Sequence, residues 1–160
     1  MGSFRAPHAL IRTAHQIRLE VLPLIHNSCP IEASVTDFDF DGLLAWMRRM
    51  PPDQEANLCK NTHLTIKLHT TSNAKKEKTS NSSRNSQSLK RWLHVRADRH
   101  RPQPAWKYTG AVPDGKTASD LKRKVKRAAV PGEKRELGEM LKAIGVPFAA
   151  ETGSNAGSDS

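Results

Sequence analysis

The stretch IEASVTDFDFDGLLAWMRRM, residues 31–50, changes from one hydrophobic period to another within twenty residues. Its first six residues alternate between apolar and polar, which is typical of a half-buried strand. The apolar side of this strand carries Ile31, Ala33 and Val35. From Phe40 onward the apolar spacing becomes helical, and Asp39 or Asp41 is the expected N-cap. The stretch therefore predicts a strand followed at once by an amphipathic helix, which Pro51 and Pro52 end.

A second alternating segment, HLTIKLH at residues 63–69, predicts another strand. The connection over residues 37–63 is long enough for the crossover of a parallel pair. The clean alternation instead suits a sheet with one solvated face, as antiparallel sheets often have. The sequence leaves both arrangements open. Because two strands alone are marginally stable, we expect a third.

Helical spacing recurs on both sides of these strands. At the start of the chain, HALIRTAHQIRLEVLPLI (residues 8–25) has apolar residues at spacings of 4, 3, 4 and 3, namely Leu10, Ala14, Ile17, Val21 and Leu24. We expect this stripe to pack on the inner sides of the two strands and on the face of the 40–47 helix. Further helices are expected over residues 89–99, 117–130 and 133–147, with an extended segment over residues 100–110. The predicted fold class is α+β, a small sheet of two or three strands packed by several helices.

The division of the chain follows its composition. Residues 1–70 are expected to form a helix-strand-helix-strand core. Residues 71–88 are rich in Ser, Asn and Lys. They can bury too little apolar surface to offset the conformational entropy that ordering costs, so they are expected to be a disordered insertion. Residues 89–148 form a basic helical region that completes or flanks the core. Residues 149–160 are expected to be a disordered tail.

Charge divides the chain into two unlike halves. The formal net charge is +10, and all of it falls after residue 71, where nineteen basic residues face nine acidic ones. No run approaches the length of a membrane-spanning helix, and no signal peptide is visible. The two cysteines, Cys29 and Cys59, are then expected to be free thiols in a reducing compartment. These features predict an intracellular protein of the nucleus or cytoplasm that has no membrane partner.

The densest charge lies in LKRKVKR, residues 121–127. This cluster can be a solvated helix face, a nuclear-import peptide or a site for nucleic acid or another polyanion. The candidate binding residues are Lys122, Arg123, Lys124, Lys126 and Arg127. The following helix is rich in glutamate, which repels phosphate, so reading of a specific DNA sequence is not expected.

Metal and catalytic patterns are weak. His26-x2-Cys29 and Cys59-x3-His63 have ligand-like spacing, but the long interval between the pairs favours two unrelated turns over a zinc site. Asp37, Asp39 and Asp41 alternate as in a calcium loop, although Arg48 stands where such a loop needs its last acidic ligand. No catalytic triad, phosphate loop or metalloprotease motif occurs. The sequence therefore predicts a non-enzymatic protein without a metal or another cofactor.

The segment LIRTAHQIRLEVLPLI resembles L-x-R-x-x-R-Q-I-R-x-E-A-L-P, which marks a large group of fungal proteins, often downstream of an F-box-like region. The matching residues are Leu10, Arg12, Gln16, Ile17, Arg18, Glu20, Leu22 and Pro23. The D-F-x-F turn at Asp37, Phe38 and Phe40 is also similar, whereas His15 and Val21 depart from the pattern. The resemblance covers roughly residues 8–70 and implies a fungal protein-interaction module related to F-box-associated proteins. It also implies a truncated or shortened form, since no F-box-like piece precedes the segment here. The alternative is a nuclear or nucleic-acid-associated basic protein that uses the 122–127 cluster.

Overall fold

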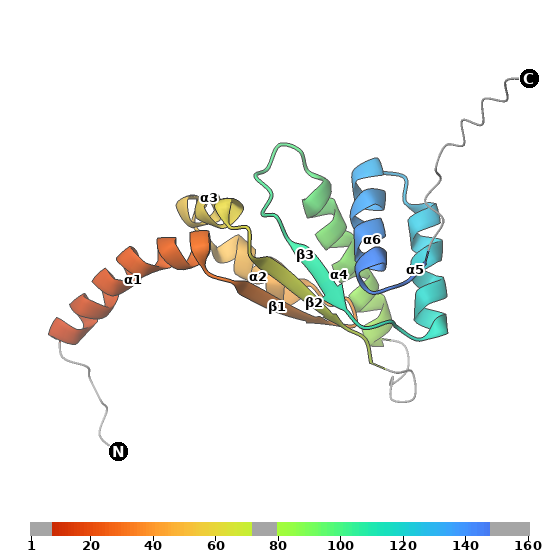
Figure 1. Ribbon diagram of the computed structural model, residues 1–160, viewed down its shortest axis with the longest axis horizontal. Helices are drawn as coiled ribbons and strands as arrows, with labels where there is room; N and C mark the ends of the chain where they lie inside the picture. Colours follow the sequence, from red (N-terminus) through yellow and green to blue (C-terminus); the bar gives the residue numbers. More distant parts are fainter. Residues whose placement is uncertain (1–7, 72–79, 148–160) are drawn as a thin grey trace, which may run out of the picture.

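The computed structural model describes residues 8–71 and 80–147, with side chains from Ala14 in the first helix and from Ser83 in the fourth. Three strands form one parallel sheet in the order β1 (Ile31–Thr36), β2 (Leu64–His69) and β3 (Lys107–Gly110). Ile31 pairs with Leu64, and Ile66 pairs with Tyr108. The predicted α+β class is thus confirmed, and the third strand comes from the extended 100–110 segment (Figure 1).

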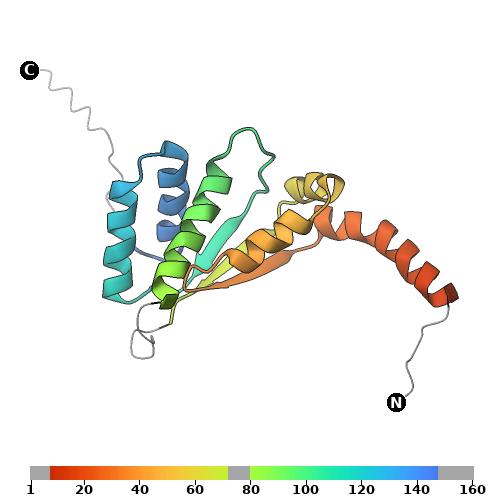
Figure 2. The same cartoon turned by 180° about the vertical axis from the view of Figure 1, so that it is seen from behind.

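The sheet is parallel and still keeps one solvated face. Leu64, Ile66 and Leu68 of β2 are buried, whereas Lys67 and His69 on the opposite face are exposed. One face stays solvated because α2 (Asp41–Arg49), which follows β1, and α4 (Ser80–Ala97), which follows β2, lie on the same side of the strands (Figure 2). The alternation of apolar and polar residues in these strands therefore indicates that helices cover only one face of the sheet. It does not distinguish parallel from antiparallel strands.

Six helices surround the strands in the described residues. They are α1 (His8–Ser28), α2 (Asp41–Arg49), α3 (Pro52–Lys60), α4 (Ser80–Ala97), α5 (Gly115–Arg127) and α6 (Pro131–Ala143). α2 and α4 cover the buried face of the sheet, and α6 packs on both α4 and β3 (Figure 2). α5 packs on the outer side of α6. α6 ends at Ala143, and Gly145, two residues further on, has a φ of +76°, the left-handed conformation that follows many helix ends.

The centre of the core is aromatic. Trp92 on α4 and Phe40 before α2 are both fully buried, and their rings stack 4.9 Å apart at an interplanar angle of 7°. β2 contributes Leu64 and Ile66, which are also fully buried. Residues before and after position 71 therefore share one core, so the 89–148 region completes the sheet layer.

The turn from β1 into α2 has an unusual backbone. Asp37 and Phe38 have φ values of +50° and +63°, a left-handed conformation that is uncommon outside glycine. The Asp37 carboxylate accepts hydrogen bonds from the Thr71 N–H and hydroxyl, which hold the turn against the end of β2. Phe40 occupies the N-cap position of α2 without a side-chain bond. The expectation that Asp39 or Asp41 is the N-cap was therefore wrong, although the Asp39 carboxylate accepts from the Asp41 N–H.

The predicted disordered insertion over residues 71–88 was too long. α4 begins at Ser80, so residues 80–88 are helical; residues 72–79, and the tail at 149–160, lie outside the described residues. Polar contacts attach residues 80–88 of α4 to the start of α2. The Ser88 hydroxyl is fully buried and accepts from the Phe40 N–H at 2.8 Å, and Arg84 pairs with Asp41. Hydrophobic periodicity could not reveal a helix end that is held by hydrogen bonds and charge.

Gly110 lies at a close approach between β3 and the end of α6. A Cβ there would lie 2.7 Å from the Leu68 carbonyl oxygen and 2.9 Å from Ile144 Cγ2. We expect Gly110→Ala to lower the free energy of unfolding by about 1–3 kcal/mol, the usual effect of overpacking. Urea denaturation followed by circular dichroism measures this change. Gly42→Ala in α2 is the matched control, because nothing lies within 4 Å of its Cβ, and equal destabilisation by both variants would contradict the prediction.

Candidate interaction surfaces

α1 attaches to the rest of the protein near its C-terminal end. There it packs on α3, and the buried His26 ring meets Trp46 edge-on with centroids 6.3 Å apart. Burial lowers the pKa of His26, whose Nδ1 has no hydrogen-bond partner among the described residues. The remainder of α1 extends away from the sheet (Figures 1 and 2). The expectation that its apolar stripe packs on the strands and on the 40–47 face was therefore wrong.

The apolar stripe of α1 is exposed. Ile17 and Leu24 keep 53% and 64% of their surface accessible, and Val21 is also exposed. Helix residues follow one another at about 100°, so these three side chains lie on the far side of α1 from His26. The helix therefore uses one face for attachment and leaves the opposite, apolar face without a partner in the described part of the chain. Its other large exposed apolar residues are Leu19 and Ile25.

The five candidate basic residues all lie on α5, around Leu121 and Val125, which are buried. Helical geometry divides them among three positions. Lys124 and Arg127 share one flank, Lys122 and Lys126 share the other, and Arg123 lies on the outer ridge. The Asp114 carboxylate caps this helix by accepting from the Thr117 N–H, so the helix begins at Gly115, before the predicted start at residue 117. The cluster is therefore part of a folded amphipathic helix, and its predicted import role is untested by this geometry.

Lys124 is the most enclosed member of the cluster. Its Nζ donates to the Ser86 hydroxyl of α4 at 3.2 Å. Its pKa is lowered chiefly by burial; the Asp120 carboxylate opposes this shift, and the positive charge of Lys90 on α4 adds to it. Asp120 pairs with the exposed Arg123 at 3.0 Å. Sequence alone could not show that Ser86 and Lys90 belong beside this cluster, because more than thirty residues separate them from it.

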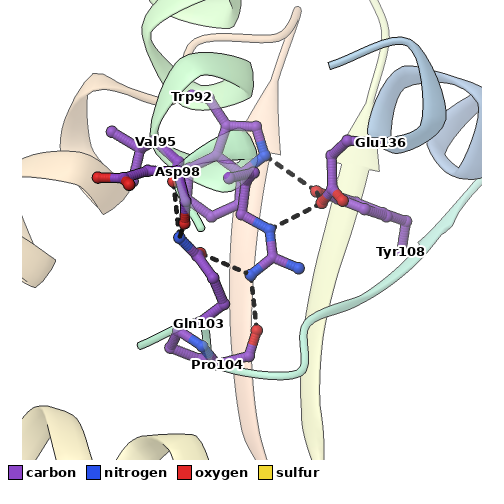
Figure 3. Close-up of polar contacts among 8 residues, drawn as sticks. Trp92, Val95, Asp98, Gln103, Pro104, Tyr108 and Glu136 are labelled. Carbon is purple, nitrogen blue, oxygen red and sulfur yellow. Dashed lines mark hydrogen bonds and ion pairs between the residues drawn. The ribbon is translucent and has the colours of Figure 1, made fainter. Parts of the chain in front are cut away.

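A buried polar network joins α4, β3 and α6 (Figure 3). The Arg96 guanidinium donates to the Glu136 carboxylate at 2.8 Å and to the Pro104 carbonyl at 2.6 Å. Trp92 Nε1 donates to the Tyr108 hydroxyl at 2.9 Å, and that hydroxyl donates a short hydrogen bond to Glu136. Each of these side chains thus has a charged or hydrogen-bonding partner, which is what burial of polar groups requires.

Tyr108 and Glu136 of this network also line a pocket of about 430 Å³ between β3 and α6. Its lining is mixed, with aromatic, acidic and basic side chains from Trp106, Lys107, Tyr108, Glu136, Glu139, Lys142 and Ala143. Burial, followed by the charge of Glu136, raises the pKa of Tyr108 well above its usual value, so the phenol remains protonated at neutral pH. Tyr108 and Glu136 hydrogen-bond to one another and to their protein neighbours, so this part of the lining is structural.

The metal-like residues are separated in the structure. No group of three or more potential ligands that could hold a metal ion occurs within residues 8–71 and 80–147. His26 is buried, whereas Cys29 and His63 are exposed and Cys59 is partly buried. The two turns lie side by side because the Asn61 amide donates to the Cys29 carbonyl at 2.7 Å and accepts from the His63 N–H. These turns align the starts of β1 and β2.

The three alternating aspartates act separately. Asp37 binds Thr71, Asp39 accepts from the Asp41 N–H, and Asp41 pairs with Arg91 at 3.3 Å. Their carboxylates stabilise the turn and the packing of α4, so the calcium-loop spacing has a structural explanation.

No known protein family, curated protein or solved structure matches this chain. The resemblance to the fungal F-box-associated group consequently stays a prediction. Among the helices described here, none is long and apolar enough to cross a membrane.

Proposed function

We propose that the protein is a non-enzymatic, intracellular protein-interaction module that pairs with a second copy of itself through α1. The exposed apolar stripe of α1 is the observation that carries this proposal, because an apolar helix face is a common docking element. An intracellular location accords with the free thiols of Cys29 and Cys59. A relation to F-box-associated proteins would suit the same role.

The spacing of the stripe favours another helix as the occupant. Intervals of 4, 3, 4 and 3 from Leu10 to Leu24 give the 3.5-residue period of a two-stranded coiled coil. A coiled coil needs the same period on both helices, and a second copy of α1 supplies it. The body of each copy lies on the opposite face, beside His26, so it leaves the stripe accessible.

Charges beside the stripe favour a parallel, in-register pair. In that arrangement Glu20 faces Ile25 of the second copy, and neither Arg18 nor Glu20 faces its own counterpart, so these like charges stay apart. An antiparallel pair would bring Arg18 near Arg18 of the second copy and Glu20 near Glu20 of the second copy. Both contacts would join like charges. Only about two heptads are present, so we expect a weak dimer with Kd on the order of 10 µM, or about −7 kcal/mol.

Analytical ultracentrifugation of the full chain tests this pairing. The wild type should shift from monomer to dimer over roughly 1–200 µM, a span that brackets the expected Kd. Ile17→Lys combined with Leu24→Lys should stay monomeric with an unchanged circular dichroism spectrum, because both side chains are exposed.

Leu19→Lys is the matched control. Leu19 is 63% exposed on the same helix but lies off the stripe, so this variant should dimerise as the wild type does. A wild type that is monomeric at the highest concentration would overturn the proposal, as would equal loss of dimer in the control.

A further inference from the structure

The surface between α4 and α5 is strongly basic. We call Lys90, Arg123, Lys124 and Arg127 the α4–α5 basic face. Lys124 bonds to Ser86 across the two helices, and Lys90 lies one helical turn from Ser86 on α4. On α5, Arg127 follows Lys124 by three residues and Arg123 by four. Lys90, Lys124 and Arg127 therefore lie along the seam between the two helices, and Arg123 lies beside Arg127 on the outer ridge of α5.

The seam lacks negative charge to balance these cations. Its one ion pair in the described residues joins Arg123 to Asp120, and both side chains are at least half exposed, so the pair is weak. No carboxylate of the described chain lies within ion-pair distance of Lys90, Lys124 or Arg127. Burial lowers the pKa of Lys124, the Asp120 carboxylate opposes this shift and the neighbouring Lys90 adds to it, so the charge on Lys124 is destabilised on balance and an external anion would stabilise it.

The geometry points to the phosphate backbone of double-stranded nucleic acid as the ligand of the α4–α5 basic face. A line of Lys and Arg on a projecting helix meets regularly spaced phosphates, and such contacts carry no sequence information. Single-strand binding normally needs aromatic side chains for base stacking. α5 contains none, and Trp92 of α4 is fully buried. This inference is independent of pairing through α1.

Fluorescence anisotropy of the full chain with a labelled duplex of roughly two helical turns tests the inference. Four phosphate contacts give an expected slope of log K against log salt of about −3.6. Lys90→Gln combined with Lys124→Gln should reduce that slope by about 2 and weaken binding at least tenfold at low salt. Glutamine keeps most of the side-chain stem, and circular dichroism should show the helices intact.

Arg48→Gln combined with Arg49→Gln is the matched control. These residues are exposed on α2, and their loss changes the net charge by the same amount. The control should bind within about twofold of the wild type, as expected for cations outside the contact region. The inference would be overturned by no duplex binding at low salt or by equal weakening in both double variants. Equally effective competition by polyglutamate would overturn it too, because it would indicate an acidic protein as the ligand. Tighter binding to a single strand of the same length would also overturn it.

Discussion

Replacement of Trp92 with alanine should lower the free energy of unfolding by about 3–5 kcal/mol. This side chain is fully buried, stacks on Phe40 and donates to the Tyr108 hydroxyl. Its removal leaves a large cavity under the sheet and deprives the Tyr108 oxygen of a donor. Because a domain of this size is typically stable by about 5–15 kcal/mol, the variant should be only marginally folded.

Urea denaturation followed by far-ultraviolet circular dichroism measures the effect, since Trp46 and Trp106 would complicate fluorescence. Trp92→Phe is the informative control. It keeps a ring against Phe40 but loses the N–H, so its effect should be about 1–2 kcal/mol. A loss of less than about 2 kcal/mol in Trp92→Ala would contradict the central place of this side chain in the core.

The second large effect is expected for Arg96→Met. The Arg96 and Glu136 side chains are only 11% and 16% exposed, so removal of the cation leaves a largely buried carboxylate without its counter-charge. Breaking such a pair typically costs about 3–5 kcal/mol. The loss of the bond to the Pro104 carbonyl adds to the effect. Chemical denaturation of the single variant measures it.

A double-mutant cycle separates the pair from the packing of its side chains. Arg96→Met with Glu136→Met should be less destabilising than the sum of the two single variants, because neither charge is left alone. Arg123→Met is the surface comparison, since its pair with Asp120 is exposed and should contribute about 0.5 kcal/mol or less. Additivity at Arg96 and Glu136 would show that the two side chains act independently.

Local patterns in the sequence predicted most of the elements. Alternation identified β1 and β2, and i, i+3, i+4 spacing identified α2 and α6. These features depend on residues close together in the chain, so one sequence is sufficient to find them.

Features that depend on distant residues were missed. Nothing near residues 80–88 indicates that Ser88 accepts from the Phe40 N–H or that Arg84 pairs with Asp41. The basic cluster of residues 122–127 was visible in the sequence as consecutive basic residues. Its neighbour Lys90 was not, because Lys90 is brought beside it only by the contact between Lys124 and Ser86. Likewise, the apolar stripe of α1 gave no sign that it faces away from the body. Periodicity identifies an apolar face and does not identify its partner.

The two halves of α4 are held by different forces. From Leu89 onward the helix is fixed mainly by buried side chains, whereas residues 80–88 rely on the hydrogen bond of Ser88 and on the ion pair of Arg84 with Asp41. Salt screens the ion pair and leaves hydrophobic burial almost untouched. We therefore expect residues 80–88 of α4 to be more sensitive to salt, and to unwind more readily, than the part of the helix that begins at Leu89. Ser86 lies in this N-terminal part of α4. Its unwinding would therefore also break the hydrogen bond from Lys124 to Ser86 and let the edge of the α4–α5 basic face rearrange.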